Sequence, residues 1–594
     1  MKKYNNRDEV EDKYKWDLTD IFKSDKEFYK TLEDVKPKIN ELKEYKNKIN
    51  NANTLLEYLK KSVDVITTIT MLDVYAFLKL DVELGKEENL KMKNDALNLY
   101  IEYNTNTSFF NNELLKINKE NYNKLFVDNK ELLEYKNYLD DIYRYKKHIL
   151  NEKEEIIVNN LVNAANSYSD ISSNILNSEN DYGKVNIDGE NTIITTSNFS
   201  SLMRNKNLNL RKKVYNNFYK KIDEYSTTLT SLLNSYVRLN DEEAKTYKYK
   251  NAWDRKLFSL EFSNNVFNTL VDTTENNLSI LHKYYELKKD VLNLDKLTIY
   301  DLNLPLSRKN HEYSIEDAKD ICLNMVKPLG EDYLKHFKKI FDNHHIDYIP
   351  YRGKRSGGYM VNTPVADPKI LMNFNYDFES VSTIAHEGGH DVNYQYINES
   401  NPVIYRGSST MLAEVMSLTN ECLLSHYMLE HAKTKEEKLI GLENIMKVIV
   451  SNLYGAVREG KIEQEMYKVV EDGGILTKEI LNKLVSDSFD KYYGKVVKRN
   501  KLSNLSWATR SHYYMDYYLY SYAICISVAC TVASKIINND KDMLNRYNKL
   551  LKVGSNVKVY DAFKILGIDL EEKEVYENAF KYFDSLIDKY KSLI

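Results

Sequence analysis

The sequence predicts a mainly α-helical protein with a small β-sheet, and three observations support this. The chain of 594 residues holds only 18 glycines and 7 prolines, the two residues that interrupt helices most strongly. Apolar residues recur every three to four positions over much of 16–182, for example in 55–80, as in amphipathic helices. Stretches rich in β-prone residues are short and few. Because a chain of this length exceeds one hydrophobic core, we expect about two to four domains.

These elements divide the chain into three expected regions. They are an N-terminal helical region over 1–183, a β-hairpin boundary over 184–198 and a larger region over 199–594 that carries the motifs described below. The hairpin is predicted because Asp188 and Gly189 stand between two β-prone pieces and form a typical turn dipeptide. Helical spacing then resumes, and KILMNF (369–374) is a candidate strand.

Composition and charge exclude several classes of protein. The net charge is −4, so no basic surface for nucleic acid or an anionic membrane is expected. Residues 1–17 hold no apolar segment, and the apolar run 522–533 is too short to cross a bilayer. The cysteines lack paired spacing and are expected to be reduced. They are Cys322, Cys422, Cys525 and Cys530. The expectation is a cytoplasmic protein, and its oligomeric state is not predicted.

The stretch AHEGGH fits the zinc-binding signature H-E-x-x-H. On an α-helix each residue advances by about 100°, so His386 and His390 lie about 40° apart on neighbouring turns and can bind one ion. Glu387 stands between them, where it can take a proton from an attacking water and pass it to a leaving amine. The signature works only on a helix, which Gly388 and Gly389 each disfavour by about 1 kcal/mol relative to alanine.

The residues around the motif predict a helix despite the two glycines. Asp377 is a suitable N-cap, and Glu379 stands near the positive end of the helix. Apolar residues recur at helical spacing at Phe378, Val381, Ile384, Ala385 and Val392. On the helical wheel Gly389 lies beside the metal face, where it is expected to leave room for substrate or ion. Gly388 lies on the buried back, where a larger neighbouring residue or a close helix must fill the space.

A catalytic zinc site needs a third protein ligand and an open position for water. A second amphipathic helix is expected over 408–431. Its Glu414, 24 residues after His390, stands among apolar residues, where an unpaired carboxylate is rare. Glu414 is therefore the predicted third ligand of one Zn²⁺ per chain. Glu421, two turns further on the same face, is the alternative ligand, although support of a ligand histidine suits it better.

A tyrosine-rich stretch, WATRSHYYMDYYLYSYA, contains His512. Neutral donors directed at an oxyanion stabilise the transition state of peptide hydrolysis by several kcal/mol, and histidine and tyrosine supply such donors. On helical spacing Tyr513, Tyr517 and Tyr520 share one face. Because the chain holds 49 tyrosines, the stretch alone fits a buried core helix as well as a catalytic segment.

Taken together, these motifs resemble the oligoendopeptidase F family of thimet-oligopeptidase-like zinc metallopeptidases over nearly the whole chain. The stretches that carry the resemblance are KWDLTDIF (15–22), YRYKKHILNEKEE (143–155), LTIYDLNLPL (297–306), GKRSGGYMVN (353–362), ILMNFNYDFESVSTIAHEGGH (370–390), LAEVMSLTNE (412–421) and HYYMDYYLYSYA (512–523).

The resemblance implies a large multi-helix body that encloses an internal channel, and hydrolysis of short peptides rather than folded proteins. It places the third ligand at Glu414 and assigns His512 and Tyr520 as transition-state donors. Tyr513 and Tyr517 then become candidate substrate-binding residues of the same segment.

The motif helix departs from the family pattern at two positions. The family usually has a bulky apolar residue where this chain has Gly388, and a small residue where it has Asp391. Nearby, strand 369–374 is expected to offer a free edge to an extended peptide substrate. The loop that contains Gly357 and Gly358 is expected to line the substrate cleft.

Two other functions fit parts of the sequence. A related exopeptidase needs a fixed charge to hold a peptide end, and Arg352, Arg355 and Arg406 are candidates. A non-catalytic helical scaffold that binds peptides is disfavoured by the intact H-E-x-x-H and the spaced glutamate. The prediction is a zinc-dependent endopeptidase that acts on short peptides. His344 and His345 are expected at the surface, outside the site.

Overall fold

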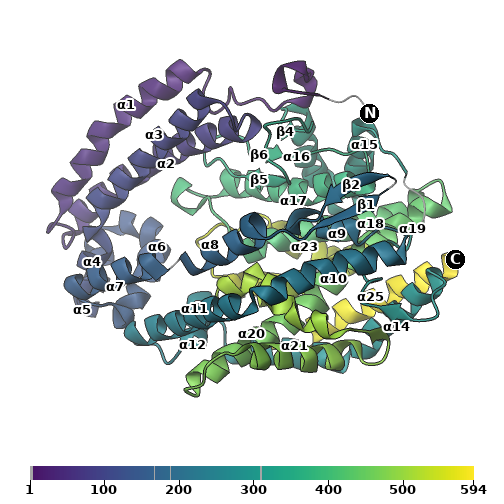
Figure 1. The fold of residues 1–594 in the computed structure, drawn as a ribbon. Coiled ribbons are helices and arrows are strands. Elements are labelled where there is room, and N and C mark those ends of the chain that lie inside the picture. The colour runs from purple at the N-terminus through teal and green to yellow at the C-terminus, as the bar shows by residue number, and fades with distance from the viewer. Residues whose placement is uncertain (1–3, 166, 188, 308–310) are drawn as a thin grey trace. The chain divides into compact units, whose positions relative to one another are not determined.

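The computed structural model describes residues 4–165, 167–187, 189–307 and 311–594 (Figure 1). Helices form most of these residues, as predicted. These residues form two compact units, each assembled from three stretches of sequence. Unit 1 comprises the described residues of Met1–Lys147, His311–Tyr427 and Val532–Gly567. Unit 2 comprises those of His148–Asn310, Met428–Thr531 and Ile568–Ile594.

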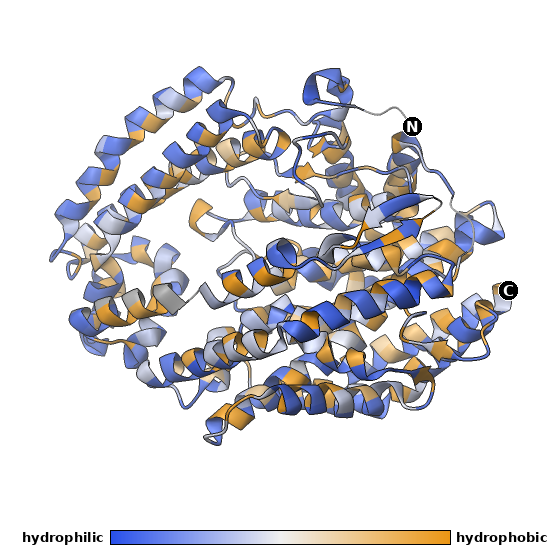
Figure 2. Cartoon of the chain, in the orientation of Figure 1, coloured by the Kyte–Doolittle hydropathy of each residue, from blue (hydrophilic) through white to orange (hydrophobic). Residues whose placement is uncertain are grey.

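The N-terminal helices of unit 1 are amphipathic. In the first of them, buried Phe28, Leu32, Val35 and Ile39 recur every three to four residues, and Ser24 caps the first turn. Figure 2 shows hydrophobic and hydrophilic residues alternating along this helix and the next two. The helices of unit 1 are α1 (Asp25–Leu42), α2 (Ala52–Val82), α3 (Glu87–Thr107), α4 (Phe109–Lys116), α5 (Lys119–Asp128), α6 (Lys136–Arg144), α15 (Ile315–Met325), α16 (Glu331–Asp342), α17 (Phe378–Ser400), most of α18 (Thr410–His431), α23 (Lys541–Leu550) and α24 (Val559–Ile565).

A small sheet lies against α17 in unit 1. Its strands are β4 (Ile346–Asp347), β5 (Tyr359–Val361) and β6 (Lys369–Leu371). They stand in the order β4–β6–β5, with β6 parallel to β4 and antiparallel to β5. The predicted strand in 369–374 is therefore confirmed, but the free edge expected for it is wrong. Both edges of β6 are paired, and β5 is the edge strand that follows it in the sheet.

Unit 2 contains the predicted hairpin. Strands β1 (Lys184–Ile187) and β2 (Glu190–Ile193) pair antiparallel, with Ile187 opposite Glu190; the turn residue Asp188 lies outside the described residues. The remaining elements are α7 (Glu152–Ala165), α8 (Ser167–Asn174), α9 (Thr196–Leu202), α10 (Leu208–Glu224), α11 (Ser226–Thr246), α12 (Ala252–Leu260), α13 (Asn264–Asn276), α14 (Leu278–Val291), β3 (Leu297–Thr298), α19 (Lys435–Ile449), α20 (Ala456–Glu471), α21 (Lys478–Tyr493), β7 (Val497–Lys498), the first part of α22 (Leu519–Ile537) and α25 (Glu574–Leu593).

Helix α22 is the most apolar helix of the chain's C-terminal part. It extends the apolar run 522–533 to a helix that could cross a membrane by length and composition, so the shortness expected of this run is wrong, but 72% of its apolar window is buried inside the protein. Burial on this scale is typical of a core helix rather than of a membrane span.

Candidate metal centre and active site

Helix α17 carries the H-E-x-x-H motif and begins where the sequence predicts. The Asp377 side chain caps it by accepting a hydrogen bond from the Ser380 N–H. The helix then continues to Ser400, so the two glycines do not interrupt it. His386 and His390 consequently stand one turn apart, with ring centroids separated by 4.9 Å.

The structure brings Glu414 of α18 to these two histidines. One possible ligand atom from each of His386, His390 and Glu414 lies within 4.8 Å of the others. The His386 Nε2 atom is 3.6 Å from Glu414 Oε2. Two imidazole nitrogens and one carboxylate oxygen are the donor set of a catalytic zinc site with an open fourth position. Within the described part of the chain, this is the one group of three such side chains close enough to hold an ion.

Glu421 lies behind His386 and not among the ligand atoms. Its Oε1 atom is 2.7 Å from Nδ1 of His386, so it accepts the Nδ1 proton and leaves Nε2 directed toward Glu414. Such a carboxylate fixes the tautomer and the orientation of a ligand imidazole. With Nε2 available and the ring held, the residues fit a zinc ion.

Carboxylates dominate the electrostatics of this group. Burial lowers the pKa of His386, but Glu421, Glu387 and Glu414 raise it, to about 9 overall. Burial and the neighbouring charge of His386 hold the pKa of His390 well below its ordinary value. Acidic side chains gathered around a partly buried imidazole pair would attract a divalent cation, which would take the place of the proton on the ligand nitrogen.

Glu387 is buried, with 9% of its surface exposed. Burial raises the pKa of its carboxyl group, and the neighbouring charge of His386 lowers it, with burial the larger effect. The backbone of Met360, in the middle of edge strand β5, lies close enough to this carboxylate to lower its pKa. Glu387 therefore stands between the potential metal ligands and the strand at the end of the sheet.

Gly389 allows α17 and α18 to approach each other at backbone distance. A Cβ atom added there would lie 2.7 Å from Ser417 Cα and 3.0 Å from the Met416 carbonyl oxygen. The expected room for substrate or ion at Gly389 is therefore wrong, because the α18 backbone fills it. This approach brings Glu414, one turn before Ser417, beside the two histidines.

The space behind Gly388 is filled by an aromatic ring. A Cβ atom added there would lie 2.7 Å from two ring atoms of Phe337 in α16 and 3.4 Å from Ile340 Cδ1. Phe337 is fully buried. A larger neighbouring residue thus occupies the position, which confirms one of the two arrangements expected for the buried back of the helix.

The loop before β5 presents its glycines at the surface. Gly357 and Gly358 are exposed, and Gly357 has a φ of +86° with nothing near its absent side chain. The Gly357 carbonyl accepts a hydrogen bond from Asn373. Of the arginines considered for an exopeptidase, Arg355 pairs with Asp81, and Arg406 donates to the carbonyls of Asn401 and Pro364.

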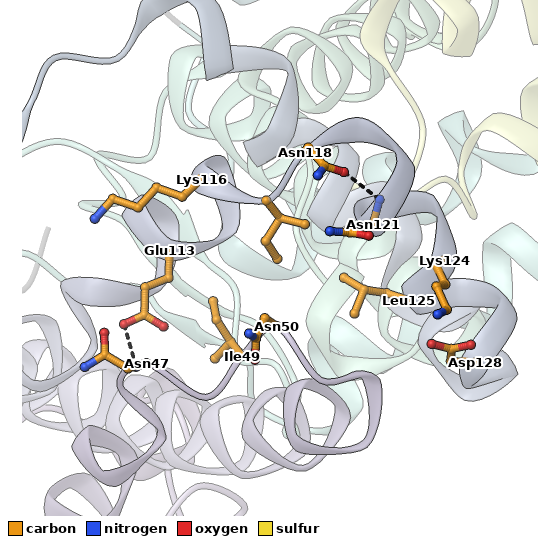
Figure 3. A pocket seen from close by; sticks show the side chains of 11 residues that line it. Asn47, Ile49, Asn50, Glu113, Lys116, Asn118, Asn121, Lys124, Leu125 and Asp128 are labelled. Carbon is orange, nitrogen blue, oxygen red and sulfur yellow. Dashed lines mark hydrogen bonds between the residues drawn. The ribbon is translucent and has the colours of Figure 1, made fainter.

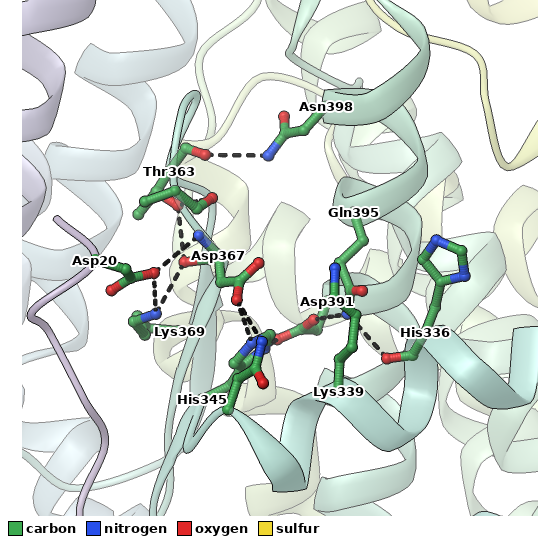
Figure 4. Close-up of polar contacts among 12 residues, drawn as sticks. Asp20, His336, Lys339, His345, Thr363, Asp367, Lys369, Asp391, Gln395 and Asn398 are labelled. Atoms are coloured by element: carbon green, nitrogen blue, oxygen red, sulfur yellow. Dashed lines mark hydrogen bonds and ion pairs between the residues drawn. The ribbon is translucent and has the colours of Figure 1, made fainter.

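His345 is fully buried, so its expected place at the surface is wrong (Figure 4). Its Nδ1 atom is 2.8 Å from Asp391 Oδ2, and its Nε2 atom is 3.2 Å from Asp367 Oδ2. Asp391 directly follows His390 and also accepts a hydrogen bond from Gln395. Asp391, which departs from the family pattern, therefore has a structural role. Its contact with His345 links helix α17 to the segment that leads into β4.

The contacts of His345 with Asp391 and Asp367 should make the free energy of unfolding depend on pH. Burial lowers the pKa of His345, but Asp391 and Asp367 raise it, to about 9, above about 6.5 in the unfolded chain. The folded state thus binds the extra proton, and this stabilisation is complete below about pH 6.5 and lost as the pH rises through 9. A shift of this size corresponds to at most about 3 kcal/mol.

We expect His345→Gln to lower the denaturant midpoint most near pH 6.5 and least above pH 9.5. The exposed neighbour His344, which has a φ of +50°, gives the control His344→Asn, since asparagine tolerates this conformation. Equal losses at both pH values would show that His345 contributes through packing and not through charge.

The predicted tyrosines lie in unit 2 and point into its core. Helix α22 begins only at Leu519, and Asp516 and Tyr517 before it have φ values of 51° and 57°. The shared helical face expected for Tyr513, Tyr517 and Tyr520 is therefore wrong, because a left-handed turn separates them. All three are nevertheless buried side chains. The Tyr520 hydroxyl donates a hydrogen bond to Gln464.

His512 instead lies beside two tyrosines that helical spacing did not select. Its ring centroid is 6.4 Å from that of Tyr518 and 5.9 Å from that of Tyr522, and the two tyrosine rings are 5.2 Å apart. All three side chains are partly exposed. Burial and the charge of Arg510 lower the pKa of His512, which favours its neutral form. The four-residue spacing of Tyr518 and Tyr522 is the signal that could have found them.

Unit 1 also has surface cavities that none of the predicted site residues line. One of about 570 Å³ is polar (Figure 3). Within it Glu113 accepts a hydrogen bond from the Asn47 N–H and Asn118 accepts one from the Asn121 N–H. A second of about 480 Å³ is lined by Tyr58, Tyr103 and other side chains of the N-terminal helices. Among the described residues that line them, neither cavity holds a cluster of metal-binding groups.

Comparisons with known proteins agree with this geometry. A model of peptidase family M3 matches residues 201–582, and a model of oligopeptidase F matches residues 113–182. Oligopeptidase PepF of Bacillus subtilis is 30% identical over 99% of this chain and 88% of its own length. An oligoendopeptidase F homologue of Borreliella burgdorferi is 29% identical over 99% of both chains.

Solved structures share the fold. A structure from Chlamydophila abortus, 27% identical, matches 99% of this chain and 100% of its own with a TM-score of 0.92. Oligoendopeptidase F from Enterococcus faecium, 23% identical, matches 96% and 99% with a TM-score of 0.74. The family model covers more than half of the chain, and the helical fold and the intact motif agree with it. The chain therefore belongs to peptidase family M3 and is a metallopeptidase that hydrolyses oligopeptides.

Proposed function

We propose that the chain is a zinc-dependent endopeptidase that cleaves short peptides at internal bonds. The observation that carries the proposal is the convergence of His386, His390 and Glu414 within 4.8 Å, with Glu387 on the same helix. A bound zinc ion would supply Lewis acidity that polarises the peptide carbonyl and lowers the pKa of water. The names of the relatives, oligopeptidase and oligoendopeptidase, support the substrate class.

Each residue around the metal group has a separate part in this proposal. Glu387 takes a proton from the attacking water and later donates it to the leaving nitrogen, so that the amine departs neutral. Burial raises the pKa of its carboxyl group, which suits a group that must both accept and release a proton. Glu421 holds the His386 ring through Nδ1 and keeps Nε2 directed at the metal position.

Strand β5 offers the backbone that an extended peptide substrate needs. It stands at the end of the described sheet, next to β6, so its other edge can accept a further strand. The backbone of Met360 on this strand lies close to Glu387. A peptide that adds to β5 would therefore pass directly in front of the general base.

His512 is proposed to donate a hydrogen bond to the oxyanion, together with a tyrosine of its segment. The resemblance assigns this tyrosine as Tyr520, but the Tyr520 hydroxyl is fully buried and donates to Gln464. Tyr518 and Tyr522, which lie beside His512, suit the role better. The proposal does not need Tyr520 to touch the substrate.

The test is a digest of paired peptides, with free and blocked ends, read by mass spectrometry. We expect both forms to be cut at the same internal bonds, with activity lost on chelation and restored by zinc. Glu414→Gln should bind zinc at least about tenfold more weakly, as measured by metal titration. Cleavage confined to peptides with free ends would replace the proposal with an exopeptidase.

A further inference from the structure

We infer that helix α20 is a positioning element for the reaction: its buried Glu459 and Glu463 and its partly buried Gln464 hold the His512 segment from behind. The inference rests on the proposed role of His512 and adds residues that do not touch the substrate. It is carried by contacts entirely within unit 2.

Three hydrogen bonds connect α20 to successive tyrosines of the His512 segment. The Tyr513 hydroxyl donates to Glu459 Oε2 at 2.5 Å. The Tyr517 backbone N–H donates to Glu463 Oε1 at 2.8 Å. The Tyr520 hydroxyl donates to Gln464 Oε1 at 3.0 Å. The acceptors thus follow one another along α20 in the same order as the donors follow along the segment.

A glycine completes this face of α20. A Cβ atom added at Gly460 would lie 2.9 Å from Cε1 and Cζ of Tyr520, so only glycine lets the Tyr520 ring pack flat against the helix. Glu459 and Glu463 stand one turn apart, and Gly460 and Gln464 form the neighbouring row. The Tyr520 ring therefore packs against Gly460, and its hydroxyl donates to Gln464 on the same row of the helix.

The contacts fix a turn that the chain would not otherwise favour. Asp516 and Tyr517 both have positive φ, a left-handed conformation that non-glycine residues adopt only where the surroundings hold them. Besides the bond from Tyr517 to Glu463, Asn240 donates to Asp516 Oδ1 at 2.9 Å, and Arg255 lies 3.5 Å from Asp516 Oδ2. The turn lies between His512 and Tyr518, so its shape sets how their rings meet.

Glu459 is held as a charged acceptor. Burial would raise its pKa, but Arg458 and Arg510 lower it, and both arginines form ion pairs with its carboxylate. A hydrogen bond from Tyr513 to an ionised carboxylate is stronger than a neutral one. Removal of the tyrosine hydroxyl alone leaves both arginine contacts in place, which makes Tyr513→Phe a conservative test.

In Tyr513→Phe we expect kcat to fall about tenfold, with KM within about twofold of the wild type. The matched control is Tyr454→Phe in the same unit, where a buried tyrosine hydroxyl donates to the Asn277 carbonyl; its kcat should not change. If Tyr513→Phe folds poorly, as judged by thermal midpoint, Gly460→Ala displaces the same segment through Tyr520, with Gly455→Ala as its control.

A double-mutant cycle with His512→Gln separates the possible results. If Tyr513 acts through His512, adding Tyr513→Phe to His512→Gln should not reduce kcat further. Full additivity, or an unchanged kcat in Tyr513→Phe and in Gly460→Ala, would overturn the inference and leave the role of His512 intact. A wild-type kcat in His512→Gln alone would instead refute the proposed role of His512, and the inference with it.

Discussion

Glutamine in place of Glu387 is expected to reduce kcat for peptide hydrolysis by about 10²- to 10⁴-fold, the usual contribution of a general base. The amide has nearly the same shape as the carboxylate but cannot accept the proton of the attacking water. Because Glu387 is not one of the three ligands that converge at the metal position, Glu387→Gln should retain stoichiometric zinc. The measurements are kcat on a blocked peptide and metal content of the purified protein.

Glu379→Gln provides a matched control on the same helix. Glu379 is exposed in the first turn of α17, so the same chemical change there should leave kcat within about twofold of wild type. Turnover retained in Glu387→Gln at normal zinc content would refute the assignment of the base. Turnover and zinc lost together would place Glu387 among the ligands instead.

The second large effect is expected from Gly389→Ala. An added methyl group would lie 2.7 Å from Ser417 Cα and 3.0 Å from the Met416 carbonyl oxygen. Backbone atoms on both sides cannot rotate away, so α17 and α18 must separate. Overpacking of this kind typically costs about 1–3 kcal/mol. Because Glu414 is on α18 and both histidines are on α17, we also expect zinc affinity to fall at least about tenfold.

Gly455→Ala tests whether any helical glycine would respond in this way. Its added methyl group would have its nearest neighbour, the Val450 carbonyl oxygen, at 3.4 Å, which is close but tolerable. Zinc titration and thermal midpoint of the two variants are compared side by side. Wild-type zinc affinity in Gly389→Ala would mean that the close helix approach does not set the ligand geometry.

The sequence predicted the local parts of this protein well. The cap at Asp377, the helix through two glycines and the helix that bears Glu414 all follow from spacing within some twenty residues. The chemistry of H-E-x-x-H requires its ligands on one helical face, so the motif and the helix support each other. For this reason the helical fold class and the family could both be recognised from the sequence alone.

Features that depend on distant partners could not be predicted. His345 is buried because Asp391, 46 residues later, meets its ring, and no local pattern around His345 shows this. The order of strands in a sheet depends on which distant segments pair. The residues of β6 alone therefore do not show that both of its edges are occupied. The face that helical spacing predicts for Tyr513, Tyr517 and Tyr520 is absent because Asp516 and Tyr517 turn the backbone into the left-handed region.

The contact between Gly388 and Phe337 bears on how the family has diversified. In this chain the volume behind helix α17 at Gly388 is filled by an aromatic ring from α16. A relative with a bulky residue at the position of Gly388 would supply that volume from α17 and should have a smaller residue opposite. We therefore expect Gly388→Leu alone to be disruptive and Phe337→Ala to compensate for it. Co-substitution at these positions, and not the glycine itself, is what evolution would be expected to preserve.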